Sequence, residues 1–343
     1  MPQKCGGRKL YMEILHKTII EKRLENGYKN YRIPGVIVTD KGNIIIYYEA
    51  RHGNDNSIID IMMRKSTDGG ITWSDRKIIF DSENHYTSNN PVMIPDGEKI
   101  HFICMRDYTR CYYRYSTDEG ETWSEPEDIT YAFDMQEHRE VIPRTVIAAG
   151  PGHGIKLHWD RLVVPVWMAY NPTDVNAHNP SCTSTITSND GGKTWRLGEL
   201  INHFSVKNPN EACICELPTG DVIINMRNET NINRRCSARS INGSWRWSKP
   251  EYQEDLVDPG CAGGMCRYDR EILFTNCESA NSRQNLTLKR SHDFGKTWED
   301  KLIYEKWGGY SDVNYDPVRK QAVLFYESEE GERRDLVVAI VKL

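Results

Sequence analysis

The sequence predicts an all-β protein folded as a six-bladed β-propeller. Three observations support this fold class: an octapeptide with the pattern S-x-D-x-G-x-T-W occurs four times, a weakened fifth copy keeps the register, and segments with the two-residue period of β-strands precede the copies. Repeats of about 50 residues built from strands and turns are typical of propellers, in which each repeat forms one four-stranded blade.

The octapeptides are predicted to be loops between strands. They occupy residues 66–73, 116–123, 188–195, 240–247 (the weakened copy) and 291–298, and their starts are 50, 72, 52 and 51 residues apart. Asp bonds nearby backbone N–H groups and Gly adopts the positive φ of a tight turn, while the final Trp packs into apolar neighbours. Single D-G turns occur in any β protein, so the spacing carries the argument. The aspartates Asp68, Asp118, Asp190 and Asp293 are expected at the rim, outside the functional site.

The repeats also predict the domain organisation. A chain of 343 residues suggests two domains by length alone, but the repeats favour a single propeller over residues 8–343 after an irregular terminus, residues 1–7. Residues 13–20 fit a strand or a short helix, and the surplus of the 72-residue interval, 131–160, is expected to be an elaborated loop. Five blades with octapeptides and the strands left over in 313–340 make six, and the last sheet is expected to include an N-terminal strand.

Composition excludes several classes of function. The formal net charge of −5 and the absence of Lys/Arg runs argue against a nucleic-acid or membrane partner, and no apolar run is long enough for a transmembrane helix. The ten cysteines form no C-x-x-C, and Cys213 and Cys215 alternate on one strand face, as buried reduced thiols do. With no signal peptide apparent in residues 1–15, we expect a cytoplasmic protein that has no metal site and no cofactor.

Three arginines suggest an anion site. Propellers place functional residues at the mouth of the central channel, on the innermost strand of each blade and its loop. Arg32, Arg227 and Arg283 stand at such places in their repeats. A single arginine usually forms a surface ion pair, but three that converge would bind a carboxylate, which a guanidinium recognises with two hydrogen bonds.

The motifs around the first arginine carry a family resemblance. Tyr31-Arg32-Ile33-Pro34, followed by Glu49-Ala50-Arg51 and the octapeptides, resembles the RIP motif and Asp boxes of the sialidase (neuraminidase) superfamily. Gly152-His153-Gly154-Ile155 with residues 161–166 is similar to the bacterial exo-sialidase branch, and the likeness extends over nearly the whole chain. The resemblance implies a six-bladed propeller that hydrolyses terminal sialic acid from oligosaccharides or glycoconjugates without a metal ion.

The resemblance also implies three catalytic residues. Asp55 matches the acid/base carboxylate, with Asp60 as its alternative; Glu211 has the family's sixteen-residue spacing to the second arginine, with Glu216 as a competitor. Tyr310, preceded by two glycines, matches the nucleophile. A sialic acid carries a carboxylate on its anomeric carbon, so a neutral Tyr activated by Glu211 avoids the repulsion that an anionic nucleophile would meet. Sialidases are the tyrosine exception among retaining glycosidases.

The remaining residues implied by the resemblance bind substrate. The carboxylate-binding triad and its neighbours are Arg32, Arg227, Arg283, Arg51 as a further contact, and Glu327, which braces the first arginine in competition with Glu329 and Glu330. Ser88-Asn89-Asn90-Pro91 stands where many relatives present an aspartate, so a related 2-keto-3-deoxy sugar acid (Kdn- or Kdo-type) is an alternative substrate. A non-catalytic propeller that binds carbohydrate or protein is the other alternative, although a binder has no need of the three catalytic residues.

Overall fold

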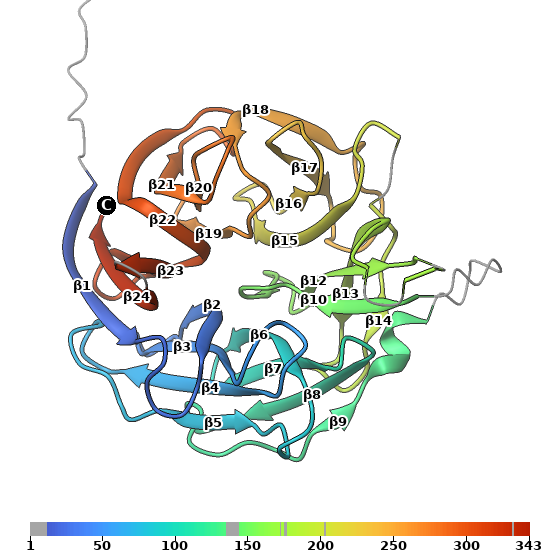
Figure 1. The fold of residues 1–343 in the computed structure, drawn as a ribbon. Coiled ribbons are helices and arrows are strands. Elements are labelled where there is room, and N and C mark those ends of the chain that lie inside the picture. Colours follow the sequence, from blue (N-terminus) through green and yellow to red (C-terminus); the bar gives the residue numbers. More distant parts are fainter. Residues whose placement is uncertain (1–11, 135–143, 172, 175–176, 202–203, 331–332) are drawn as a thin grey trace, which may run out of the picture.

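The strands form six blades around a central axis (Figure 1). The computed structural model describes residues 12–343 except 135–143, 172, 175–176, 202–203 and 331–332. The predicted irregular terminus, residues 1–7, and the predicted domain start at residue 8 lie outside this part of the chain. Within it, the prediction of a six-bladed all-β propeller is confirmed.

Each blade is an antiparallel sheet whose first strand lies nearest the axis (Figure 1). Blade one contains β2 (Asn30–Val38), β3 (Ile44–Arg51), β4 (Ile59–Ser66) and β5 (Lys77–Phe80). Blade two contains β6 (Ser88–Asp96), β7 (Lys99–Arg106), β8 (Arg110–Ser116) and β9 (Glu127–Asp128). Blade three contains β10 (Val146–Ala149), β12 (Leu162–Ala169), β13 (Ser181–Ser188), β14 (Arg196–Leu197) and the short β11 (Ile155–Lys156), which pairs with β12. Blade four contains β15 (Pro209–Glu216), β16 (Val222–Asn228), β17 (Arg234–Ser240) and β18 (Glu251–Val257).

The last two blades share one long strand. Blade five consists of β19 (Gly264–Tyr268), β20 (Glu271–Cys277), β21 (Gln284–Ser291) and the first part of β22 (Glu299–Asp316). From Gly308 onward β22 pairs instead with β23 (Gln321–Glu330), which is followed by β24 (Arg333–Lys342) and β1 (Glu13–Glu21). β1 pairs with β24, so residues 13–20 form a strand, and the expectation that an N-terminal strand completes the last sheet is confirmed.

The insertion in blade three differs from its prediction. The surplus segment 131–160 was expected to be a loop, but it contains most of the 3-10 helix η1 (Thr130–Phe133) and the strands β10 and β11. The prediction is wrong for these parts because the first strand of blade three has to come from this stretch, ahead of β12. Residues 135–143 lie outside the described part of the chain.

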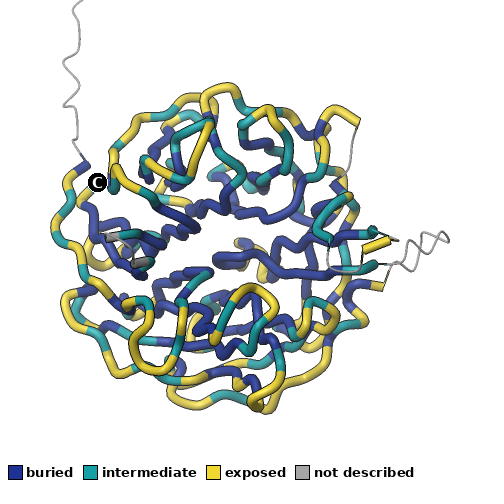
Figure 2. Tube along the Cα trace, viewed as in Figure 1, coloured by how far each residue is buried: buried dark blue, intermediate teal, exposed yellow. Residues whose placement is uncertain are grey.

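Buried residues are concentrated in the interior of the ring (Figure 2). Strands such as β3, the second of blade one, pack against a neighbouring blade on each face. In β3, Ile44, Ile46 and Tyr48 contact residues of blade six, whereas Ile45 and Tyr47 pack with residues of blade two. Successive side chains of a strand point to opposite faces, so a strand buried on both faces needs an uninterrupted apolar run. This explains why β3 is apolar throughout until Glu49 and Arg51, at the channel mouth.

The octapeptides form the loops between the third and fourth strands of their blades, as predicted. In the first copy, Gly70 N donates to Ser66 Oγ at 2.8 Å and Thr72 N donates to Asp68 Oδ1 at 2.9 Å. Hydrogen bonds from Thr72, with smaller contributions from the rest of the loop, lower the pKa of Asp68 to about 2. The Asp118, Asp190 and Asp293 carboxylates accept equivalent bonds from the threonine of their own loop. These aspartates therefore stabilise turns.

The cysteines are buried thiols wherever the structure describes them. Nine of them, from Cys104 to Cys277, are free and buried. No helix in the described part of the chain is both long and apolar enough to cross a membrane.

Buried His101 is expected to make the fold sensitive to acid. Its Nδ1 lies 2.8 Å from Tyr113 Oη, and burial lowers its pKa from 6.5 to about 4, although Asp96 opposes this shift. The unfolded chain binds the proton near pH 6.5, so the stability that neutral His101 contributes is complete above that pH. Between pH 6.5 and pH 4 we expect it to decline by roughly 3 kcal/mol.

The measurement is the free energy of unfolding as a function of pH for wild type and His101→Asn. The variant is expected to lose stability at pH 8 and to have a flatter slope between pH 6.5 and pH 4. His85→Asn, a change at an exposed histidine, is the control. Parallel curves for wild type and His101→Asn would contradict the assignment.

Candidate active site

Four of the innermost strands are irregular at the same level of the channel. In blades one, two, four and six, the pairing of the first strand with the second shifts register. The shifts lie between Arg32 and Gly35, between Asn89 and Val92, between Pro209 and Ala212, and between Gly308 and Ser311, respectively. A β-bulge turns side chains away from the regular alternation of a strand and is frequent beside active sites. Three of the predicted residues, Arg32, Glu211 and Tyr310, lie at these bulges.

Tyr310 and Glu211 form a hydrogen-bonded pair across the channel. The Tyr310 hydroxyl, on β22, lies 2.8 and 2.7 Å from the two carboxylate oxygens of Glu211, on β15, and donates its proton to that carboxylate. Both side chains are buried. Burial, followed by the negative charge of Glu211, raises the pKa of Tyr310 above its ordinary value, while the surrounding arginines oppose the shift. The phenol is thus neutral at rest and is placed to lose its proton to a fixed base.

The three predicted arginines surround Tyr310. The guanidinium carbons of Arg32 and Arg283 lie 5.0 and 5.2 Å from the centre of its ring, and Arg227 Nη1 donates to its hydroxyl at 3.0 Å. Arg227 is also paired with Glu211. Arg283 forms no ion pair with any of the described residues and makes only a long bond, 3.5 Å, to the Gly260 carbonyl. The structure therefore brings the triad together, with one guanidinium left without an anionic partner.

Glu327 ties the first and last blades together beneath this cluster. Its carboxylate accepts hydrogen bonds from Arg32 Nε at 2.9 Å and Nη2 at 3.3 Å, from Ile33 N at 3.1 Å and from Tyr310 N at 3.2 Å. Burial opposes ionisation of Glu327, but the Arg32 charge and these donors outweigh it and lower the pKa. Glu327 thus fixes both Arg32 and the backbone that carries Tyr310.

Two backbone features make room for the Glu327 carboxylate. A Cβ on Gly309 would lie 1.9 Å from Glu327 Oε2, so only glycine fits directly before Tyr310. Ile33 adopts φ of +59°, which is rare for a β-branched residue and costs on the order of 1–3 kcal/mol. The N–H of this strained residue is one of the donors to the Glu327 carboxylate.

Asp55 belongs to a second charged group at the channel mouth. Arg51 is buried and paired with Asp55 and with Glu49, whose Oε2 accepts from Arg51 Nε at 2.7 Å. Asp55, in the loop between β3 and β4, is 57% exposed and also lies 3.5 Å from Arg32 Nη1. Burial opposes ionisation of Asp55, but the charges of Arg51 and Arg32 outweigh it and lower its pKa. Arg51 therefore contacts the two carboxylates and orients Asp55 toward the arginines.

The alternative residues lie elsewhere. The Asp60 carboxylate accepts hydrogen bonds from Tyr28 Oη at 2.7 Å and from Ser82 N at 2.8 Å. Both of these partners lie outside the cluster. Glu216 ends β15 and is buried, and its carboxylate is contacted by His158 and Arg267 outside the cluster. Of the three glutamates considered for bracing the first arginine, Glu327 is the one that bonds Arg32.

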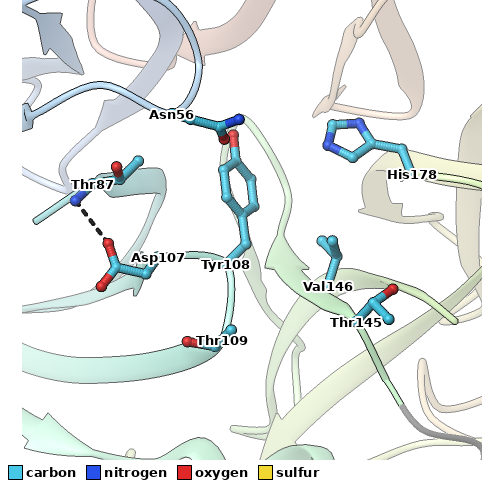
Figure 3. Close-up of a pocket in the computed structure, with 8 residues that line it drawn as sticks. All are labelled: Asn56, Thr87, Asp107, Tyr108, Thr109, Thr145, Val146 and His178. Carbon is cyan, nitrogen blue, oxygen red and sulfur yellow. Dashed lines mark hydrogen bonds between the residues drawn. The ribbon is translucent and has the colours of Figure 1, made fainter. Parts of the chain in front are cut away.

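A cleft of about 280 Å³ lies next to Asn56, the residue that follows Asp55. Asn56 lines it together with Tyr108 and His178, and Figure 3 shows the Tyr108 phenol pointing toward Asn56 with His178 facing it across the cleft. Burial, then the Glu49 carboxylate, raises the pKa of Tyr108. Two other lining residues are bonded to each other, since Asp107 Oδ1 accepts from Thr87 N at 2.9 Å (Figure 3).

Sequence reasoning missed several members of the site. Glu49 was visible in the Glu49-Ala50-Arg51 motif, but nothing assigned it a partner. Tyr108 and His178 lie in loops without a motif, and Glu229, which contacts Arg227, is separated from it by one residue. Glu229 directly follows β16, and its i, i+2 spacing from Arg227, which places two side chains on the same side of an extended chain, is the signal that could have found it. Among the described residues, no group of three or more His, Cys, Asp or Glu could hold a metal ion.

Comparisons with known proteins show the family to which the chain belongs. The chain belongs to the BNR repeat-like domain family, whose model matches residues 42–317. The resemblance to the sialidase superfamily is confirmed. The chain is similar to an Arthroderma benhamiae exo-alpha-sialidase, with 25% identity over 90% of the chain and 81% of the relative.

Two further matches are longer than this chain. A Bacteroides fragilis sialidase is 23% identical over 94% of the chain and 66% of the relative. The solved structure of the Hadza microbial sialidase Hz136 superposes with a TM-score of 0.77 and 23% identity, covering 92% of the chain and 66% of Hz136. The chain thus spans slightly less than two thirds of each, and at this identity the superposition shows a shared fold.

Proposed function

We propose that the protein is a retaining exo-α-sialidase, which releases terminal sialic acid from oligosaccharides or glycoconjugates. The observation that carries the proposal is the Tyr310–Glu211 pair, enclosed by three arginines. Three guanidinium groups suit a carboxylate, and a neutral nucleophile beside them suits a carbon that bears one. The relatives named as sialidases support the same class of enzyme.

The first half of the reaction forms a covalent intermediate. With the substrate carboxylate held by the triad, the anomeric carbon faces Tyr310 Oη. Glu211 takes the phenolic proton as Oη bonds to that carbon, the glycosidic C–O bond breaks, and the departing oxygen takes a proton from Asp55. The product is a glycosyl-tyrosine.

The second half reverses these transfers. A water molecule attacks the anomeric carbon and gives its proton to the Asp55 carboxylate, while Tyr310 leaves and recovers its proton from Glu211. Two successive displacements at one carbon retain its configuration. Substrate binding also favours the acid form of Asp55, because the substrate carboxylate offsets the Arg32 charge that lowers its pKa.

The test is turnover by the purified protein. An aryl α-glycoside of N-acetylneuraminic acid is compared with the corresponding Kdn and Kdo glycosides, and the anomer first released is identified by proton NMR. We expect the α-anomer of the N-acetylated sugar. Preference for a Kdn or Kdo glycoside would assign a related sugar acid as the substrate. An absence of turnover with all three glycosides would contradict the proposed enzymatic activity.

The role of Asp55 predicts a dependence on the leaving group. An alcohol leaving group needs a proton, whereas an activated phenolate does not. Asp55→Asn is therefore expected to lower kcat/KM, which reports the first half of the reaction, by about 10²–10⁴-fold for a sialyl oligosaccharide and by far less for a nitrophenyl sialoside. Steady-state rates with both substrates measure this, with Asp60→Asn as the comparison. Equal losses for both leaving groups would argue that Asp55 only positions substrate.

A further inference from the structure

The second arginine of the triad lies between two carboxylates. On one side Arg227 Nη1 contacts Glu211 and the Tyr310 hydroxyl, and on the other Nη2 donates to Glu229 Oε1 at 3.0 Å. Arg227 Nε is buried and has no hydrogen-bond partner. The orientation of the guanidinium plane is therefore decided by the balance between Glu211 and Glu229.

Glu229 is itself held from two directions. Asn210 Nδ2 donates to its Oε1 at 3.1 Å, and Asn179 Nδ2 donates to its Oε2. Asn210 directly precedes Glu211 in the bulge of β15, and its Oδ1 accepts from Glu211 N at 2.8 Å. Asn179 follows His178, which lines the cleft next to Asn56. One carboxylate thus connects the arginine, the bulge that presents the base, and the loop that lines the cleft.

We propose that Glu229 is a positioning residue that keeps Arg227 from pairing with Glu211 alone. The inference rests on the proposed function of the site. A base fully paired with an arginine holds its proton less well, and an arginine fully paired with a base is less available to a substrate carboxylate. By fixing Nη2, Glu229 leaves Nη1 at Tyr310 and maintains the basicity of Glu211.

The charges that face Glu211 define what the loss of Glu229 does. Arg227 contacts Glu211 directly, and Arg32 and Arg283 lie beyond Tyr310, so Glu229 is the anion that offsets the arginine on this side. When the charge of Glu229 is removed, Arg227 is expected to turn toward Glu211, and the positive potential at Glu211 is expected to rise. Both effects favour the carboxylate form of the base, so the acid limb of the kcat/KM profile moves to lower pH.

The experiment compares Glu229→Gln and Glu229→Asp with wild type on the aryl α-sialoside. Glu229→Gln is expected to raise KM about 10- to 100-fold, the effect of a misplaced charge-assisted hydrogen bond, with a smaller change in kcat. Its acid limb is expected to lie at least about half a pH unit below that of wild type. Glu229→Asp keeps the charge and is expected to restore the acid limb, though not the whole of KM.

Glu254→Gln is the matched control, because Glu254 is 86% exposed and lies 3.8 Å from Arg234 in the same blade. Melting temperatures show whether each variant is folded. The inference is overturned if Glu229→Gln matches this control in KM and acid limb, or if its only loss is in melting temperature. Turnover by wild type separates this outcome from failure of the proposed function, which would leave wild type itself inactive.

Discussion

Tyr310→Phe is expected to lower kcat for an aryl α-sialoside by at least about 10³-fold, because it removes the atom that forms the covalent bond and leaves the rest of the site in place. The phenol oxygen accepts from Arg227 and donates to Glu211, and neither partner loses its other contacts in the variant. The fold and the binding of sialic acid should therefore persist.

Rates measured under saturating substrate, together with isothermal titration of N-acetylneuraminic acid, test this expectation. Tyr115→Phe is the control, since Tyr115 is 39% exposed on β8. Wild-type turnover in Tyr310→Phe would exclude the glycosyl-tyrosine. Loss of both turnover and binding would show that the hydroxyl serves chiefly to organise the arginines.

Arg283→Gln is expected to lower kcat/KM by about 10²-fold or more, from the roughly 2–5 kcal/mol lost when one partner of a desolvated, hydrogen-bonded charge pair is truncated. Arg283 is the cleanest of the three arginines to replace. It forms no ion pair with the described residues, whereas replacement of Arg32 would strand the buried Glu327 carboxylate. Arg283→Gln should therefore weaken the binding of substrate without lowering the stability of the fold.

A substrate with a neutral methyl ester in place of the carboxylate isolates this effect. Wild type is expected to favour the free acid strongly, and Arg283→Gln to lose most of that preference. Arg110→Gln, at an exposed arginine of blade two, is the control. If Arg283→Gln keeps the wild-type preference, the carboxylate binds elsewhere.

The fold was predictable because its determinants are local and repeated. Each octapeptide carries its own turn donors and acceptors, as Ser66 and Asp68 show, so the main determinants of its conformation lie within the eight residues. The insertion in blade three was not predicted, since the apolar run of residues 146–149 is only four residues long and stands alone among turn residues.

Apart from the three arginines, the site was predictable only through the resemblance to a known family. Arg32 and Glu327 are separated by 295 positions, and no pattern in the sequence states that they pair. The bulges that aim Arg32, Glu211 and Tyr310 into the channel depend on tertiary contacts such as those of Glu327 with Ile33 N and Tyr310 N. Glu229 and His178 escaped notice because their roles come from contacts with other loops.

The closure of the ring by β1 and β24 has a consequence for how the protein folds. Most strand pairings are between neighbours in the chain and can form as soon as a hairpin is complete. The bonds from Arg32 and Ile33 to Glu327, in contrast, require a loop of almost the whole chain to close, which is entropically costly and slow. Individual blades can therefore be assembled well before the arginines meet at Tyr310. Recovery of enzymatic activity during refolding would then report the last step of folding, the joining of the first blade to the sixth, rather than the appearance of β-structure.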